Sequence, residues 1–157
     1  MKGAQAGKLV VASNRKAWHH YEILEEYEAG LCLNGPEVKS LRDGKVSLEG
    51  SFARVEGEEA YLHNLHIAPY IHNTLQQISP TRTRKLLMHR NEIQRLQGRQ
   101  QAKGLSLIPL EIYFRRGWAK VLLALARGKR GPDKRESIRK HDASREMERS
   151  FKSKYKL

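Results

Sequence analysis

The chain has 157 residues, which is about the length of one domain with a core of its own plus a tail. Its 30 Lys and Arg residues against 17 Asp and Glu give a formal net charge of +13, and such an excess predicts a polyanionic partner. The sequence contains neither a long apolar run nor a strongly apolar amphipathic face, so nucleic acid is favoured over a membrane surface.

The cysteine content and the first residues indicate the compartment. Cys32 is the only cysteine, which excludes an internal disulfide and a cysteine-based zinc cluster and fits a reducing environment. Residues 1–8 are short and polar and do not have the pattern of an export signal. We therefore expect a cytoplasmic protein.

The first predicted elements are two strands with a basic segment between them. Lys8–Ser13 is a short apolar strand, and Tyr21–Leu33 is a long strand with one polar face, in which Gly30 is typical of a bulge. Residues 14–21 mix cations with aromatic side chains, a composition that suits phosphate neutralisation and stacking on unpaired bases. A solvated surface turn explains the same segment equally well.

A short helix is predicted from Asn34-Gly35-Pro36 to near Gly44, because proline is tolerated in a first helical turn. Lys39 and Arg42 are three residues apart and therefore share one outward face of this helix. These two cations are candidate RNA contacts. From the pattern alone, a helix whose polar side is merely solvated is slightly favoured.

The middle of the chain predicts a hairpin, formed by Phe52–Glu56 and Ala60–Asn64, and then a polar loop that reaches Thr83. Arg82, Arg84 and Lys85 precede an apolar turn that contains Leu87. An exposed leucine beside cations can pack on a splayed base, so Arg84, Lys85 and Leu87 are candidate RNA contacts. Burial in the core is the more common fate of a single leucine.

A second helix is predicted over His89–Gln101, followed by two strong strands, Leu105–Phe114 and Trp118–Arg127, that form a hairpin. Pro109 argues for a bulge or an edge position. The alternation predicts one apolar side on each strand: Ile108, Leu110, Ile112 and Phe114 on the first, facing Val121, Leu123 and Leu125 on the second.

These elements predict a mainly β fold with a few helices, namely a small OB-like antiparallel β-barrel with external helices, over residues 1–128. The composition changes at Gly128, because residues 129–157 contain 11 Lys or Arg and only 5 acidic residues. The sparse apolar side chains there cannot offset the entropy of ordering. We expect this basic tail to be disordered when free and helical against a partner.

Signatures of an enzyme are not found in the sequence. There is no glycine-rich phosphate loop, and no carboxylate or cysteine ligands are grouped with His63 and His66, whose spacing could bracket a metal. We therefore expect no catalytic activity and no cofactor.

Several blocks occur in an order and spacing that resembles the small protein B family, over roughly Leu9 to Arg139. The blocks that carry the resemblance are Asn14-Arg15-Lys16-Ala17, Tyr27-Glu28-Ala29-Gly30, Glu37-Val38-Lys39-Ser40-Leu41-Arg42, Arg84-Lys85-Leu86-Leu87 and Asp133-Lys134-Arg135. Pro132 stands where the family often has an aromatic or histidine side chain.

The resemblance implies that the barrel binds the tRNA-like domain of transfer-messenger RNA near its elbow and that the protein acts in trans-translation. We expect it to be a monomer. It assigns RNA contact to Asn14, Arg15, Lys16, Glu28 and Leu87. A carboxylate near phosphates is repelled unless it orients a cation or accepts hydrogen bonds from a base, and we favour the orienting role for Glu28.

The resemblance further implies that the tail reads the empty mRNA channel and decoding centre of the small ribosomal subunit. Asp133, Lys134 and Arg135 match the functional triplet of the family's tail. Lys129 and Arg130 belong to a cationic hinge before it, which is equally compatible with an ordinary flexible basic terminus.

Two other classes of protein share some of these features. A ribosomal or ribosome-assembly protein would have the same charge and barrel but would bind ribosomal RNA without transfer-messenger RNA. A small RNA-processing enzyme would need a clustered catalytic set of side chains.

Overall fold

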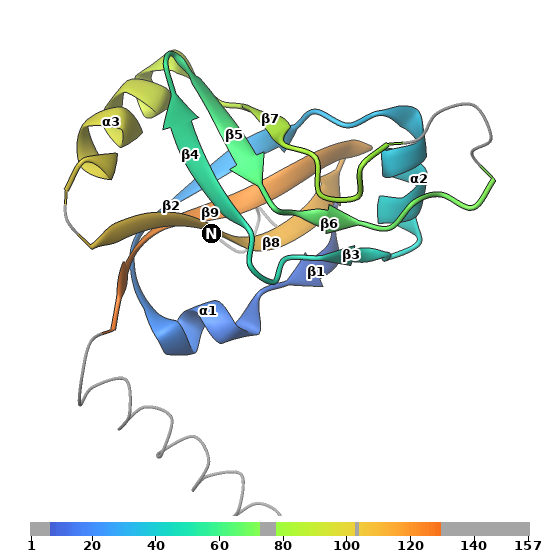
Figure 1. Ribbon diagram of the computed structural model, residues 1–157, viewed down its shortest axis with the longest axis horizontal. Helices are drawn as coiled ribbons and strands as arrows, with labels where there is room; N and C mark the ends of the chain where they lie inside the picture. Colours follow the sequence, from blue (N-terminus) through green and yellow to red (C-terminus); the bar gives the residue numbers. More distant parts are fainter. Residues whose placement is uncertain (1–6, 73–77, 103, 130–157) are drawn as a thin grey trace, which may run out of the picture.

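The computed structural model describes residues 7–72, 78–102 and 104–129 (Figure 1). Most of the elements in these residues are strands, and three helices pack outside the sheet. The elements in chain order are β1 (Lys8–Ser13), α1 (Arg15–His20), β2 (Tyr21–Leu31), α2 (Gly35–Arg42), β3 (Val46–Ser47), β4 (Phe52–Glu56), β5 (Glu59–His63), β6 (His66–Ile67), β7 (Arg84–Leu87), α3 (Arg90–Gln100), β8 (Leu105–Arg115) and β9 (Trp118–Gly128).

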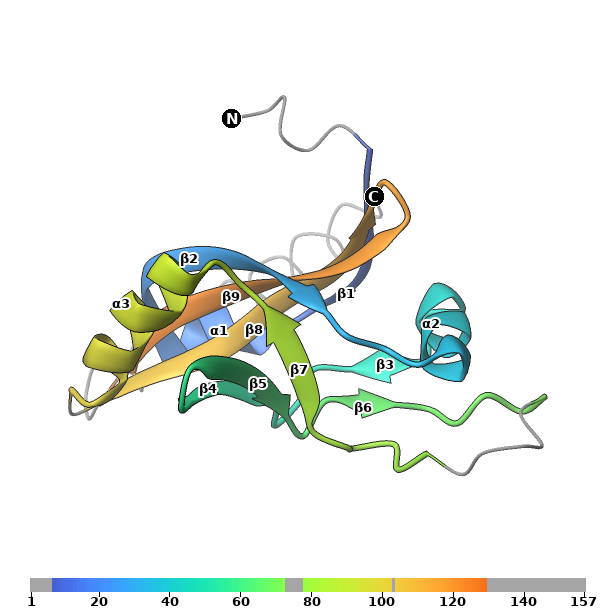
Figure 2. The same ribbon diagram turned by 90° about the horizontal axis from the view of Figure 1, so that it is seen from above.

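The main sheet closes into a barrel, as predicted. Its strands follow in the order β8, β4, β5, β7, β2 and β9, and β9 pairs back with β8, while β1 adds to the remaining edge of β8. The pairs that the registers record are all antiparallel. The short strands β3 and β6 form a separate two-stranded sheet. In two views at right angles, α2 and α3 lie at opposite ends of the barrel (Figures 1 and 2).

The barrel interior is filled by the side chains that alternate inward along each strand. Leu62, Val121 and Leu123 are completely buried, and α2 and α3 close the two ends with Leu41 and with Ile93 and Leu96. At about 25 cal/mol per Å² of apolar surface, this core is the main stabilising contribution to the fold.

The hairpin of β8 and β9 contains a bulge at Pro109, one of the two positions predicted for this proline, since its register shifts between Pro109 and Glu111. The extra residue reverses which side chains point inward. Ile112 and Phe114 face the barrel core, whereas Ile108 and Leu110 belong to a second, external cluster. The expectation that all four share one face was therefore wrong, because a regular alternation does not continue through a bulge.

The external cluster explains why α1 forms. Ala17 of α1 is 3% exposed and packs on Ile108 and Leu110 of β8 and on Ala124 and Ala126 of β9. The basic segment, for which a solvated surface turn was one of two explanations, is thus a single short helix that covers part of the outer barrel wall.

Gly30 plays a different part from the one predicted. The register of β2 is irregular between Ile23 and Glu25, not at Gly30. A Cβ atom at Gly30 would lie 3.1 Å from the Cβ of Leu87, so the glycine lets β7 cross close to β2. The missing side chain therefore determines where Leu87 sits on the surface.

Where β4 no longer pairs with β8, the side chain of Gln100 takes up the free backbone hydrogen bonds of β4. β4 pairs with β8 only at Ala53, opposite Leu107, which leaves the backbone of Val55 without a strand partner on that side. Gln100 of α3 accepts a hydrogen bond from the Val55 N–H at 2.8 Å and donates one to the Val55 carbonyl at 3.2 Å. This amide fixes α3 against the open edge.

Candidate nucleic-acid interface

The outer barrel wall that α1 leaves open is organised around Glu28 of β2. One carboxylate oxygen of Glu28 accepts hydrogen bonds from the Tyr113 hydroxyl and, at 2.5 Å, from Nη1 of Arg115. Both partners lie on β8, with side chains opposite in direction to the inward Ile112 and Phe114. Glu28 therefore holds a cation, the role favoured for it from the sequence.

Lys8 of β1 extends this network. Its ammonium lies 4.3 Å from the centre of the Tyr113 ring and 3.4 Å from a carboxylate oxygen of Glu111. Tyr113 is only 1% exposed beneath these side chains. Burial raises the pKa of Tyr113, and its hydrogen bond to Glu28 acts in the same direction, so the hydroxyl stays protonated and remains a donor.

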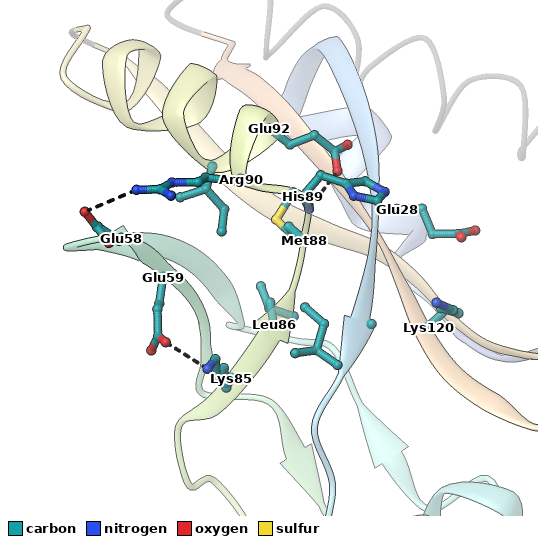
Figure 3. A pocket seen from close by; sticks show the side chains of 13 residues that line it. Glu28, Glu58, Glu59, Lys85, Leu86, Met88, His89, Arg90, Glu92 and Lys120 are labelled. Atoms are coloured by element: carbon teal, nitrogen blue, oxygen red, sulfur yellow. Dashed lines mark hydrogen bonds and ion pairs between the residues drawn. The ribbon is translucent and has the colours of Figure 1, made fainter.

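Leu87 lies beside this network with 56% of its surface exposed. A cavity of about 610 Å³ adjoins it and is lined by Glu28, Lys85, Leu87 and Lys120 among others (Figure 3). Three residues predicted as RNA contacts, Glu28, Lys85 and Leu87, therefore come together at one place.

The charge of Lys85 is shared with a neighbouring carboxylate. Its ammonium lies 2.8 Å from Oε1 of Glu59, an ion pair drawn in Figure 3. The hydrogen bond from Lys85 lowers the pKa of Glu59 and raises the pKa of Lys85. Both side chains are nearly half exposed, so Lys85 can exchange this partner for a phosphate at little cost.

Arg84 was predicted to contact RNA, but its side chain is buried and forms hydrogen bonds within the protein. Its side chain is 0% exposed, and Nη1 and Nη2 donate hydrogen bonds to the carbonyls of Leu65 and Pro80 at 2.5 and 3.1 Å. Its Nε donates to Glu37 at 2.7 Å. A guanidinium enclosed in this way cannot reach a ligand, so we leave Arg84 out of the interface.

Glu37 joins α2 to the strand that carries Leu87. It is 4% exposed and accepts hydrogen bonds from its own helix cap at Asn34, from Arg82 and from Arg84. Burial acts to raise the pKa of Glu37, but these hydrogen bonds outweigh it and the pKa lies below its usual range. Burial lowers the pKa of Arg84, which Glu37 partly offsets.

The two cations predicted on α2 share an exposed side of the helix, as expected, while Leu41 is buried. The Lys39 ammonium lies 5.4 Å from the centre of the Tyr70 ring, and the Arg42 guanidinium lies 5.7 Å from that of Phe114. Arg42 therefore borders the end of the β8–β9 hairpin.

The residues predicted next to β1 lie elsewhere. The side-chain amide of Asn14 donates a hydrogen bond to the Pro109 carbonyl at 3.2 Å, which ties α1 to the bulge of β8. Arg15 and Lys16 are exposed, and the ammonium of Lys16 lies 3.4 Å from Glu49. All three line a separate cavity of about 740 Å³. The predicted contacts thus divide into two regions.

The start of the tail adjoins the second region. The Lys129 N–H donates a hydrogen bond to the carbonyl of His20, the last residue of α1. Arg130, Asp133, Lys134 and Arg135 lie outside the described residues.

Three residues of the interface escaped prediction, namely Tyr113, Arg115 and Lys120. Their signal is the alternation of polar residues on β8 and β9, which places Tyr113 opposite Lys120 and Arg115 opposite Trp118. That signal becomes readable only once the bulge at Pro109 has been located.

Among residues 7–72, 78–102 and 104–129, no group of three or more His, Cys, Asp or Glu side chains is placed to hold a metal ion. Within the same residues, no helix is long and apolar enough to cross a membrane.

Comparison with known proteins assigns this architecture to a family. The family model described as "SmpB protein" matches residues 11–153. An SsrA-binding protein from Elusimicrobium minutum is 53% identical over 96% of both chains, and one from Pelotomaculum thermopropionicum is 55% identical over 94% of this chain and 97% of its own.

A solved structure agrees with these relatives. The chain described as "tmRNA-SmpB: a journey to the center of the bacterial ribosome" is 57% identical and superposes with a TM-score of 0.67. The match covers 82% of this chain and 94% of that one.

Proposed function

The chain belongs to the SmpB family, and on this premise we propose that it binds transfer-messenger RNA and delivers it to stalled ribosomes for trans-translation. The family's SsrA-binding relatives and the tmRNA-SmpB structure on the ribosome support both partners. The observation that carries the proposal is the part of the outer barrel wall that contains Glu28, Leu87, Arg115 and Lys120, which we call the open face. On this face Glu28 holds Arg115 beside Leu87 and Lys120.

The RNA contact surface centres on this face. Arg115 and Lys120 supply positive charge to neutralise phosphates, and the exposed Leu87 packs on a base or sugar. Glu28 acts through Arg115, because its Oε2 already accepts two hydrogen bonds from protein donors. Lys85 contributes when phosphate replaces Glu59 as its partner.

Other cations widen the footprint. Arg42 on α2 borders the hairpin end of the open face, and Lys39 lies on the same exposed side of α2, beside Tyr70. Arg15 and Lys16 present a second basic site on α1. Asn14 supports that second site by fixing α1 to β8. We assign Arg15 and Lys16 to RNA contact and Asn14 to positioning them.

The basic tail, residues 129–157, provides the ribosomal half of the function. It begins next to α1 at Lys129, and its net charge of +6 suits an RNA-lined channel. In this proposal it is disordered in the free protein, becomes helical in the mRNA channel, and uses Lys129, Arg130, Asp133, Lys134 and Arg135 near the decoding centre.

The proposal describes a cytoplasmic, monomeric RNA-binding protein without catalytic activity. Catalysis would need a cluster of nucleophilic or acid–base groups on the RNA-facing wall. Two of the carboxylates on that wall are instead held by cations: Glu28 by Arg115, and Glu111 by Lys8.

A matched pair of surface variants tests the assignment. Leu87→Asp places a negative charge on the open face and should weaken binding of transfer-messenger RNA by at least tenfold. Ile71→Asp, at a residue that is 76% exposed outside this face, should leave the affinity unchanged. Equal affinities of the two variants would remove the open face from the site.

The same purified protein distinguishes the alternative. A ribosomal or ribosome-assembly protein would bind ribosomal RNA fragments at least as tightly as transfer-messenger RNA. A clear preference for transfer-messenger RNA in competition supports the proposed function.

A further inference from the structure

A second cavity shares Leu87, Lys85 and Lys120 with the one in Figure 3, and we propose that it binds one unpaired nucleotide of the bound RNA. It has a volume of about 590 Å³ and lies between the end of β2, α2 and the tip of the β8–β9 hairpin. Roughly 300–1,000 Å³ is usual for sites that enclose small ligands. This inference rests on the proposed function and adds to it the kind of RNA feature that is recognised.

The walls of the cavity suit a flat aromatic ring. Phe114 and Trp118 line it together with Leu87 and Val38. Trp118 is 72% exposed and Leu87 is 56% exposed, so two large apolar side chains border the opening without cover from any residue that the structure describes. Stacking of a base on an indole is a sequence-tolerant way to bury such a surface.

The charges around the cavity select an anionic ligand. Arg82, Lys85 and Lys120 line it, and no carboxylate is found among its described lining residues. Lys120 forms no ion pair with any residue in the described ranges, and its charge is therefore available to a phosphate. A purely apolar peptide would gain nothing from these cations, whereas a nucleotide uses both the rings and the charges.

Arg82 keeps part of its charge available as well. Its partner Glu37 also pairs with the buried Arg84, so one carboxylate faces two guanidinium groups and a charge of +1 remains. The Arg82 side chain is 30% exposed toward solvent while Arg84 is enclosed. The buried pair thus holds Arg82 at the cavity rim.

The concave shape favours an unpaired nucleotide over a duplex. A base within a helix has both faces stacked and its pairing edge occupied, so it cannot enter a cavity between a helix and a hairpin tip. Gly30 contributes to the space because it offers no side chain where Leu87 crosses β2.

Tryptophan emission tests the site directly, because the chain contains only Trp18 and Trp118. In the full-length Trp18→Phe protein, all indole emission comes from Trp118. A single-stranded RNA hexamer should quench this emission, and the same hexamer in a blunt duplex should leave it unchanged. Equal responses to the two forms, or no response to either, would overturn the proposal.

Affinity for transfer-messenger RNA provides the second arm. Trp118→Ala should weaken binding about tenfold, the loss typical of one stacked base, and Trp118→Phe should restore most of it. Ile71→Ala, at a comparably exposed apolar residue, is the matched control and should bind like the wild type. Wild-type affinity in Trp118→Ala contradicts the nucleotide site alone.

The two proposals fail in different ways. If the unaltered protein does not prefer transfer-messenger RNA over duplex RNA, the proposed function is wrong. If it does prefer it but Trp118 neither responds to single strands nor affects affinity, only the nucleotide site is wrong.

Discussion

Replacing Glu28 by Gln tests the organisation of the open face, because the structure and simple electrostatics predict opposite changes in RNA affinity. A carboxylate repels the phosphates of RNA, so Coulomb interactions alone predict tighter RNA binding when it is removed. The structure predicts weaker binding, because Glu28 positions Arg115 at 2.5 Å and also accepts a hydrogen bond from Tyr113.

The size of the loss follows from the geometry. A hydrogen bond to a charged group is worth roughly 1.5–3 kcal/mol. About a third of each side chain is exposed, 36% for Glu28 and 28% for Arg115, and solvent screening reduces the value to about 1 kcal/mol. We therefore expect an affinity about fivefold lower, with a melting temperature close to that of the wild type.

The control is Glu26→Gln, on the same strand and the same outward side two residues away. Glu26 is exposed and has no ion pair with any residue in the described ranges, so its removal should leave affinity equal or slightly higher. Anisotropy of labelled transfer-messenger RNA at about 0.15 M salt measures both variants. Tighter binding by Glu28→Gln, or equal affinities of the two variants, refutes the orienting role.

A double-mutant cycle checks that the effect passes through the cation. If Glu28 acts by holding Arg115, the combination of Glu28→Gln with Arg115→Gln should bind no more weakly than Arg115→Gln alone. Additive losses would show that the carboxylate contacts the RNA independently.

Four further predictions concern the buried ion cluster, the charge of the face and the tail. Arg84→Met should destabilise the fold by about 3–5 kcal/mol in urea denaturation, because it leaves buried carbonyls unpaired; unchanged stability with lost RNA affinity would restore Arg84 as a contact. The lowered pKa of Glu37 contributes stability above its usual pKa that is lost as the pH falls through its folded value, so the wild type should lose more stability below roughly pH 4.3 than Glu37→Gln does; parallel pH profiles would contradict this. Lys120→Ala should reduce the slope of log affinity against log salt by about one, and an unchanged slope would exclude a phosphate contact. Deletion of Lys129–Leu157 should retain RNA binding but abolish tagging on stalled ribosomes, and a truncated protein that still supports tagging would contradict the proposed division of roles.

The barrel was predictable because its longest strands repeat apolar residues at every second position. α2 was predictable from Asn34-Gly35-Pro36 at its start, where the Asn34 N–H donates a hydrogen bond to Glu37 in the structure. α3 begins with the same kind of bond, from the His89 N–H to Glu92. The predicted and observed bounds of α3 differ by one residue at each end.

Local patterns could not reveal features that depend on contacts across the barrel. Arg84 lies in a basic run that reads as surface, and only the approach of Glu37, 47 positions earlier, makes its burial favourable. Gly30 similarly reads as a bulge until Leu87 is seen to cross it. Both residues are explained by partners distant in the sequence.

Only part of the candidate site could be predicted, because its residues also meet through contacts across the barrel. Glu28, Lys85 and Leu87 were selected separately and the fold brings them together, whereas Arg115 and Lys120 become visible only in strand register. The sequence did not predict α1, because its stability comes from the external cluster around Ala17 and not from its own six residues.

Competition binding with the full-length protein tests the central claim most directly. Labelled transfer-messenger RNA is displaced by unlabelled transfer-messenger RNA or by a duplex RNA of equal length, at about 0.15 M salt. The open face and its cavities predict at least a tenfold preference for transfer-messenger RNA. Equal displacement by the two competitors would show a merely cationic protein and contradict the account.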